Sequence, residues 1–177
     1  QRLPHDGANY RLDEAVVSER DGLLRADDYD DVYFAARDGL AESRHVFIDG
    51  TNFAETLHRH KHLTIAETGF GSGLNFLAVL DALQKFPDYQ PDYQPGYQID
   101  YIAFESRPLP ADVIARTHAG FPSLAAHSTA LLDNLPPRWP GLHLCHFNQG
   151  QVRLHLRYGE AEDCLAQSRF CADIWFL

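Results

Sequence analysis

The sequence predicts an α/β protein with a doubly wound, Rossmann-like sheet, and the segment 63–80 is the main reason. Residues 63–66 form an apolar run long enough for one buried strand, and Glu67 closes it. A loop with glycine at every second position follows, and 74–80 then has the composition of a helix start. A strand, a glycine loop and a helix in this order form the nucleotide-binding turn of doubly wound sheets.

The spacing of the glycine loop favours a ligand without phosphate. Dinucleotide folds use G-x-G-x-x-G, with the pyrophosphate at the helix N-terminus. Here Glu67 precedes Gly69, Gly71 and Gly73, and a carboxylate so close would repel a pyrophosphate but could hold an ammonium group. A ligand with an amino-acid end, such as S-adenosylmethionine, suits this pattern. A tight turn that binds nothing is the alternative, which is disfavoured because three glycines cost conformational entropy unless the backbone needs them.

A second strand is expected at 100–105, and it also ends in an acid, Glu105. In nucleotide-binding α/β folds an acid at this place holds the ribose hydroxyls. Glu105 lies further downstream than the usual twenty or so residues. Three tandem P-[DG]-Y-Q tetrads at 87–98 account for the excess, because a proline at every fourth position excludes a helix or a central strand there. We expect a surface loop at the repeat.

The second half of the chain predicts helices at 108–119 and 123–135, followed by a hairpin. Two alternating segments, 142–147 and 152–158, flank a turn. The second of them runs into Gly159-Glu160, which opens a further helix. Glu160 could accept a hydrogen bond from an adenine edge, or it could simply supply negative charge at a helix N-terminus; the residues alone leave both open.

The N-terminal part has weaker patterns. We expect a short hairpin within 1–28. Asp30 or Asp31 is expected to cap a helical turn. In the alternative, Tyr33 or Phe34 stacks on a flat substrate ring; from the residues alone the cap is favoured.

Two further elements are expected before the first core strand. Segment 39–44 reads as a short helix, and 45–48 reads as a strand that ends in a turn at 49–50. The sequence His-Arg-His-Lys-His at 58–62 could present three histidines on one face of a strand to a metal. It offers no acid or thiol ligand, so a solvated basic loop without metal is favoured.

Length, charge and cysteine content limit the kinds of protein that the chain can be. The 177 residues suit one domain, and the net charge of −10 argues weakly against a large basic nucleic-acid surface. The odd number of cysteines, with no C-x-x-C pair, indicates unpaired thiols in a reducing compartment: Cys145, Cys164 and Cys171. There is no signal peptide and no apolar run of about eighteen residues, so we expect a soluble, cytoplasmic protein without membrane contact.

Several segments, in order, resemble one family. They are Asp30-Asp31-Val32-Tyr33-Phe34, Gly39-Leu40-x-Glu42-x-Arg44-x-Val46-Phe47, the block Glu67–Leu77, Phe104-Glu105 and Asp173-x-Trp175-Phe176-Leu177. Together they resemble the methyltransferase domain of the MnmC family of tRNA wobble-uridine enzymes, a class I S-adenosylmethionine-dependent methyltransferase. The resemblance runs from about residue 28 to residue 177.

The resemblance implies a set of site residues. The methyl donor would be bound by Glu67, Gly69, Phe70, Gly71, Ser72, Gly73 and Asn75 at its methionine part, by Glu105 at its ribose, and by Glu160 and Ala161 at its adenine. Asp31, Tyr33 and Phe34 would face the substrate pocket, which reverses the preference for a helix cap. No metal is implied. The family's catalytic acid would follow the strand that matches 173–177, just beyond Leu177.

The resemblance also implies a reaction and partners. The family methylates the primary amine of 5-aminomethyl-(2-thio)uridine at the tRNA wobble position, so the tRNA anticodon region would be the partner. We expect an N-terminal extension at about 1–60 and a donor-binding core at about 61–177 that lacks the C-terminal strands of the usual sheet. An FAD-dependent oxidase domain would be separate or fused, with no FAD in this chain. The alternatives are a methyltransferase for a small-molecule amine and a non-catalytic donor-binding fragment.

Overall fold

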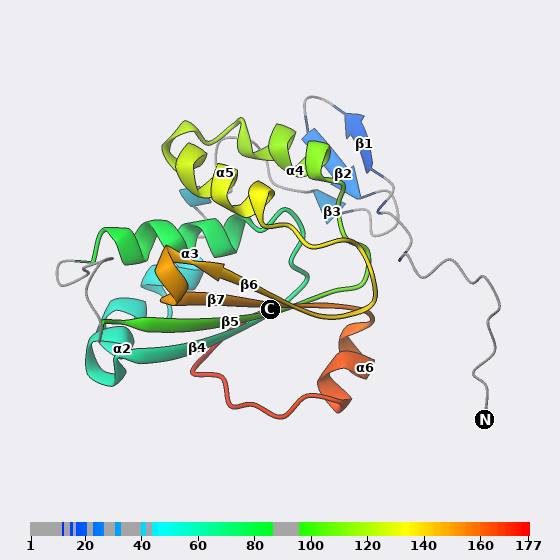
Figure 1. The fold of residues 1–177 in the computed structure, drawn as a ribbon. Coiled ribbons are helices and arrows are strands. Elements are labelled where there is room, and N and C mark those ends of the chain that lie inside the picture. The colour runs from blue at the N-terminus through cyan, green and yellow to red at the C-terminus, as the bar shows by residue number, and fades with distance from the viewer. Residues whose placement is uncertain are drawn as a thin grey trace, which may run out of the picture.

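The computed structural model describes residues 12, 15, 17–20, 23–26, 31–32, 40–41, 44–86 and 96–177. These residues form two sheets with helices beside the larger one (Figure 1). The small sheet is antiparallel and has the order β1-β2-β3, with β1 at Val17–Arg20, β2 at Leu23–Ala26 and β3 at Asp31–Val32. The hairpin expected within 1–28 is therefore confirmed.

The larger sheet has the order β6-β7-β5-β4-β8. Its strands are β4 (His62–Thr68), β5 (Gln98–Glu105), β6 (Gly141–Phe147), β7 (Val152–Tyr158) and β8 (Ile174–Phe176). The pairs β4–β5, β4–β8 and β5–β7 are parallel, and β6 joins β7 as an antiparallel hairpin. The predicted α/β sheet and the predicted hairpin are both confirmed.

Helices precede the larger sheet and lie between its strands along the chain. They are η1 (Arg44–Asp49, a π-helix), α2 (Phe53–His60), α3 (Leu74–Gln84), α4 (Ala111–His118), η2 (Pro122–Leu124), α5 (Ala125–Asp133), η3 (Asn148–Gly150) and α6 (Ala161–Ala166). In Figure 1, α3, α4 and α5 lie on one side of the sheet, and α6 lies on the other. The helices predicted at 108–119 and 123–135 correspond to α4 and to η2 with α5.

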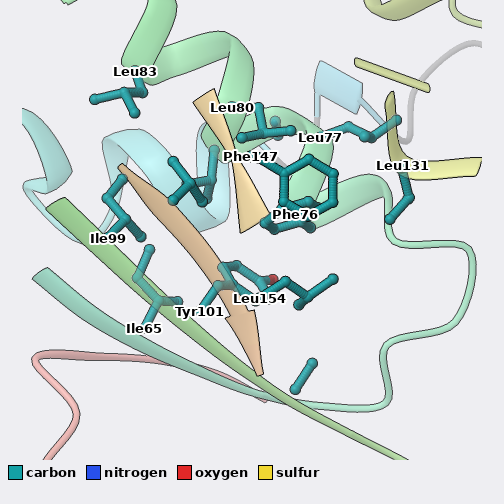
Figure 2. Close-up of a cluster of buried hydrophobic side chains, with 14 of the residues drawn as sticks. Ile65, Phe76, Leu77, Leu80, Leu83, Ile99, Tyr101, Leu131, Phe147 and Leu154 are labelled. Atoms are coloured by element: carbon teal, nitrogen blue, oxygen red, sulfur yellow. The ribbon is translucent and has the colours of Figure 1, made fainter. Parts of the chain in front are cut away.

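The core fills the space between α3 and the sheet (Figure 2). Phe76 of α3 is fully buried, and its ring packs edge-to-face with the rings of Tyr101 and Phe147 at centroid distances of 5.1 and 5.0 Å. Leu77 and Leu80 continue this face of the helix. α3 is buried along almost its whole length, which fixes the glycine loop that precedes it against the sheet.

Two predicted elements near the N-terminus are wrong. Segment 45–48 is not a strand, because it lies within η1, where the Arg44 guanidinium pairs with Asp81 of α3 at 2.6 Å. A short apolar run fits a strand or a helix equally well, so the sequence pattern alone does not decide between them. Asp31 does not cap a helical turn, because Asp31–Val32 pairs with β2 as strand β3. Tyr33, Phe34 and the repeat at 87–95 lie outside the described residues.

The basic segment 58–62 is not a loop. Residues 58–60 complete α2, which continues because Phe53 and Leu57 are buried beneath it, and His62 begins β4. The three histidines therefore do not share one strand face. The described part of the chain holds no group of three or more side chains suited to a metal ion. None of its helices is long and apolar enough to cross a membrane.

Phe76 should dominate the stability of this core. Phe76→Ala removes a fully buried ring and leaves a cavity, so we expect a loss of about 3–5 kcal/mol in the free energy of unfolding. Urea unfolding followed by circular dichroism measures it. The control is Leu144→Ala on β6, whose side chain is 52% exposed and should change stability by no more than about 0.5 kcal/mol. Equal losses in the two variants would contradict the assignment of the core.

Candidate functional site

The glycine loop lies at the carboxyl end of β4 and is bound to the carboxyl end of β5. The amides of Gly69 and Phe70 donate to the carbonyl oxygen of Phe104 at 2.9 and 3.2 Å. The amide of Gly71 donates to the carboxylate of Glu105 at 2.9 Å. Ligands of open α/β sheets bind outside the carboxyl ends of the strands, so this edge is the candidate site.

The three glycines are required by backbone geometry. Gly69, Gly71 and Gly73 have φ values of +83°, +54° and +78°, in the left-handed region that other residues rarely adopt. Gly73 also lacks space: a Cβ there would lie 2.7 Å from Phe70 Cζ and 2.9 Å from Leu131 Cδ2. At Gly69 a Cβ would meet nothing within 4 Å. The tight turn that the spacing predicts is therefore present.

Glu105 joins the loop to the turn after β7. Its second carboxylate oxygen accepts from the Arg107 amide at 2.8 Å, and its carbonyl accepts from the Gly159 amide at 2.9 Å. Burial raises the pKa of Glu105 despite the backbone hydrogen bonds that it accepts, and the charge of Glu160 raises it further. The structure thus brings Glu105 and Glu160 to the same edge of the sheet as the glycine loop.

Glu160 has a structural role as well. It is the residue before α6, with extended backbone, and its carbonyl accepts from the Cys164 amide. Its side chain is exposed and Ala161 begins the helix. Helix N-terminal charge and ligand contact, which the sequence left open, are therefore compatible at this position.

Glu67 is turned inward beneath the loop. The residue is 2% exposed, and its carboxyl group accepts from Asn75 Nδ2 and from the Tyr101 hydroxyl, both at 2.7 Å. Burial raises the pKa of Glu67 to about 8, although both hydrogen bonds act to lower it. Tyr101 lies 34 residues away in the chain, and no sequence pattern indicated it as a partner.

Two acceptor atoms near the loop have no hydrogen-bond partner among the described residues. They are Ser72 Oγ and Asn75 Oδ1, and both atoms are buried. A buried polar atom without a partner costs about 1–3 kcal/mol, so a ligand that supplies a donor would recover this energy. The site therefore has unused hydrogen-bonding capacity at the start of α3.

His118 of α4 supports the loop from the outer helices, and no sequence pattern indicated this residue. Its Nε2 lies 2.9 Å from the carbonyl oxygen of Ser72, and its Nδ1 lies 2.8 Å from Ser128 Oγ. A carbonyl can only accept, so Nε2 carries the proton and Nδ1 accepts from the serine. Burial lowers the pKa of His118, which favours this neutral form. The contacts span 46 and 10 positions, so no local signal in the sequence could have found them.

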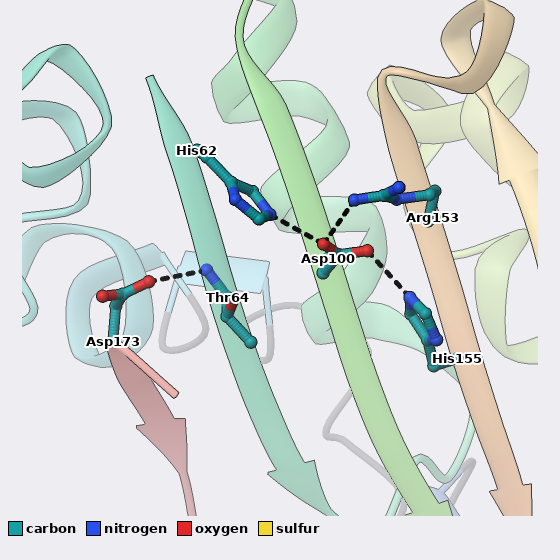
Figure 3. A network of polar contacts seen from close by, with 6 residues as sticks. All are labelled: His62, Thr64, Asp100, Arg153, His155 and Asp173. Carbon is teal, nitrogen blue, oxygen red and sulfur yellow. Dashed lines mark hydrogen bonds and ion pairs between the residues drawn. The ribbon is translucent and has the colours of Figure 1, made fainter. Parts of the chain in front are cut away.

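A second polar cluster lies on the sheet face away from α3 (Figure 3). Asp100 bonds to His62, Arg153 and His155 at 2.7, 2.6 and 2.8 Å, and Asp173 accepts from the Thr64 amide at 2.8 Å. Burial would raise the pKa of Asp100, but these hydrogen bonds, that from Arg153 first, lower it. The cluster joins neighbouring strands and is separate from the glycine loop.

Of the three expected substrate-contacting residues, the structure describes only the backbone of Asp31. The backbone of Asp31 forms part of β3, and its side chain is outside the described structure, as are Tyr33 and Phe34. Whether these residues come near the glycine loop stays a prediction.

The chain is similar to known tRNA-modification proteins. It is 41% identical over 150 residues to the tRNA 5-methylaminomethyl-2-thiouridine biosynthesis bifunctional protein MnmC of Magnetococcus marinus, which covers 84% of this chain and 21% of that protein. It is 37% identical over 171 residues to the protein of the same name in Marinobacter nauticus, covering 94% of this chain and 26% of that protein. The chain thus spans only 21–26% of the length of these relatives. No protein-family model matches it.

A solved structure shares the fold. The crystal structure of MNMC2 from Aquifex aeolicus superposes with a TM-score of 0.62 at 22% identity, covering 87% of this chain and 45% of that one. At this identity the likeness concerns the fold alone.

Gly73 and Gly69 offer a matched test of the loop. Gly73→Ala adds a Cβ that strains φ and overlaps the Phe70 ring and Leu131, so we expect a loss of about 2–4 kcal/mol in the free energy of unfolding. Gly69→Ala strains φ only and should cost about 1–2 kcal/mol. Urea denaturation measures both, and a larger loss in Gly69→Ala would contradict the described packing.

Glu67 should make the chain less stable as the pH rises. The folded chain keeps the proton of Glu67 up to about pH 8, whereas an ordinary glutamate loses it near 4.5. The folded-state pKa is the higher one, so the stability is fully present below 4.5 and is lost as the pH rises through 8. Glu67→Gln removes this titration. Between pH 5 and 8 the wild type should lose on the order of 3 kcal/mol relative to the variant, measured by urea unfolding. A difference independent of pH would show that Glu67 is not a buried neutral acid.

Proposed function

Because the chain is related over most of its length to one part of the MnmC bifunctional proteins, we propose that it binds S-adenosylmethionine at the glycine loop and serves the methylation of the 5-aminomethyl group of wobble (2-thio)uridine in tRNA. The observation that carries the proposal is the glycine loop bound to the carboxyl end of β5 through Glu105. The names of the relatives support the tRNA substrate.

The residues present fit such a donor. Glycine backbone at positive φ lets a ligand approach closely, and Asn75 Oδ1 is a buried acceptor that an ammonium group would satisfy. In our proposal Glu67, Asn75 and the segment 69–73 serve the methionine part of the donor. Glu105 serves the ribose, and Glu160 with Ala161 serves the adenine edge. Asp31, Tyr33 and Phe34 are proposed substrate contacts on the resemblance alone.

The chemistry requires mainly orientation. The bound donor supplies a methyl group on a sulfonium for in-line transfer to a neutral amine. The loop and Glu105 would fix the two ends of the donor, and such proximity supplies much of the rate. The amine must lose its proton first, so a nearby carboxylate would help. We assign this role to no described residue.

A small-molecule amine is the second candidate substrate. The net charge of −10 favours it, because tRNA binding usually depends on a basic surface. The two candidates differ in salt dependence: tRNA affinity should fall steeply between 50 and about 200 mM salt, whereas a small amine should respond weakly.

Donor binding is the first test. Isothermal titration calorimetry of this chain should detect S-adenosylmethionine and should detect no binding of NAD, because the glycine spacing departs from the G-x-G-x-x-G of dinucleotide folds. Glu105→Ala should weaken donor binding about tenfold or more, since it removes a charged hydrogen-bond acceptor. Absence of S-adenosylmethionine binding, or preferential binding of NAD, would overturn the proposal. Methyl transfer to undermodified tRNA, compared with transfer to the free 5-aminomethyluridine nucleoside, then separates the two substrates.

A further inference from the structure

We propose that the sheet face away from α3 carries a phosphate-binding pocket for an RNA strand, lined by Arg153, Arg157 and Arg169. This inference rests on the tRNA substrate of the proposed function and adds a contact surface for that substrate outside the glycine loop. The pocket has a volume of about 490 Å³, which lies in the range of ligand-binding cavities.

Strand periodicity places a row of basic side chains on one face of β7. Arg153, His155 and Arg157 alternate with fully buried leucines. Successive side chains of a strand point to opposite faces, so these three share the face away from α3 and are spaced about 7 Å apart. Arg157 pairs in register with Phe104, whose carbonyl oxygen accepts from the glycine loop. The row therefore runs along β7 toward the sheet edge at which the candidate site lies.

Neighbouring groups orient two of the guanidinium groups without using all of their donors. Arg153 donates to Asp100 at 2.6 Å (Figure 3). Arg157 donates to the carbonyl oxygen of Cys164 at 3.1 Å and to the hydroxyl of Ser168. Among the described residues these bonds use one terminal nitrogen of each guanidinium group, which has five N–H donors in all. The remaining donors have the planar geometry that binds a phosphate through two hydrogen bonds.

The charge of the pocket is opposite to that of the whole chain. Three guanidinium groups and one carboxylate, that of Asp100, line the pocket and give it a formal charge of +2, whereas the chain carries −10. Asp173, bonded to the amide of the lining residue Thr64, lies beside the pocket and reduces this charge but leaves it positive. An acidic chain that binds RNA needs such a local concentration of cations, because phosphate contacts supply most of the affinity for nucleic acids.

Apolar side chains in the same pocket favour a nucleotide of an RNA strand over a bare phosphate ion. Leu142 of β6 is 53% exposed and lies opposite Arg157 in register. Phe170 also lines the pocket, and its ring stacks on Phe104 at a centroid distance of 6.2 Å. Unpaired bases of RNA pack on aromatic and apolar side chains while their phosphates contact arginine. The pocket therefore suits an unpaired nucleotide of the tRNA.

An arginine variant tests the pocket through tRNA affinity and its salt dependence, both measured by fluorescence anisotropy. Arg169→Gln removes an exposed cation and should weaken binding of undermodified tRNA about three- to tenfold. The slope of log affinity against log salt concentration should fall in magnitude by about 0.7–0.9, which corresponds to one phosphate contact.

Arg116→Gln is the matched control for the arginine variant. It makes the same charge change on α4, on the other side of the sheet, where the side chain is 57% exposed (Figure 1). This control should leave the affinity and the salt slope at their wild-type values. Equal losses in Arg169→Gln and Arg116→Gln, or an unchanged slope in Arg169→Gln, would overturn the inference.

Asp100→Asn gives a test with the opposite sign. It removes the carboxylate that lines the pocket and keeps an oxygen that can accept from Arg153. The pocket becomes more positive, so tRNA affinity should rise about twofold or more. Weaker binding of tRNA by this variant would overturn the inference, because the carboxylate would then be needed for the contact.

Further measurements separate other occupants of the pocket. Competition by free uridine monophosphate as strong as competition by tRNA would indicate a mononucleotide site and would overturn the assignment to RNA. A dimer of the wild type that Arg169→Gln dissociates, seen by sedimentation, would place a second copy of the chain there instead, and would also overturn it.

A failure of this inference is distinguishable from a failure of the proposed function. Arg169→Gln should bind S-adenosylmethionine as the wild type does, because its side chain lines the pocket on the face away from α3. Wild-type tRNA binding that does not depend on Arg169 would reject this inference alone. A wild type that binds no tRNA would reject the tRNA substrate of the proposed function, and this inference with it.

Discussion

The fold and the site depend on one contact, between the glycine loop and the carboxyl end of β5. Three amides of the loop, those of Gly69, Phe70 and Gly71, donate to Phe104 and Glu105. This contact holds the loop that leads directly into α3, and α3 buries Phe76 against Tyr101 and Phe147. The same strand end accepts the Gly159 amide after β7. Core packing and the candidate site therefore share one set of hydrogen bonds.

Several polar side chains next to this contact are buried, and they support the loop that forms the candidate site. Glu67 lies below the loop with Asn75 and Tyr101, and His118 holds the carbonyl of Ser72 from above. Burial favours the neutral form of both side chains, because it raises the pKa of Glu67 and lowers the pKa of His118. Because these groups are neutral, they can support the loop without placing an uncompensated charge in the core.

The sequence predicted the parts of the fold that local patterns determine. Short-range composition and spacing predict strands β4 and β5, the glycine turn and the hairpin β6–β7. Glu67 and Glu105 lie near the ends of these two strands. The pattern of 45–48 predicts a strand, whereas the segment lies in η1, whose first residue, Arg44, pairs with Asp81, 37 positions away in the chain. For the same reason the partners of Glu67 and His118 were not predictable: each is brought close only by the tertiary fold.

The most direct test of the account is a crystal structure of this chain with S-adenosylhomocysteine. We predict the ligand at the carboxyl ends of β4 and β5, with its amino-acid end at the glycine loop and its ribose hydroxyls about 3 Å from the Glu105 carboxylate. A ligand bound elsewhere on the sheet, with no contact to the glycine loop or to Glu105, would contradict the account.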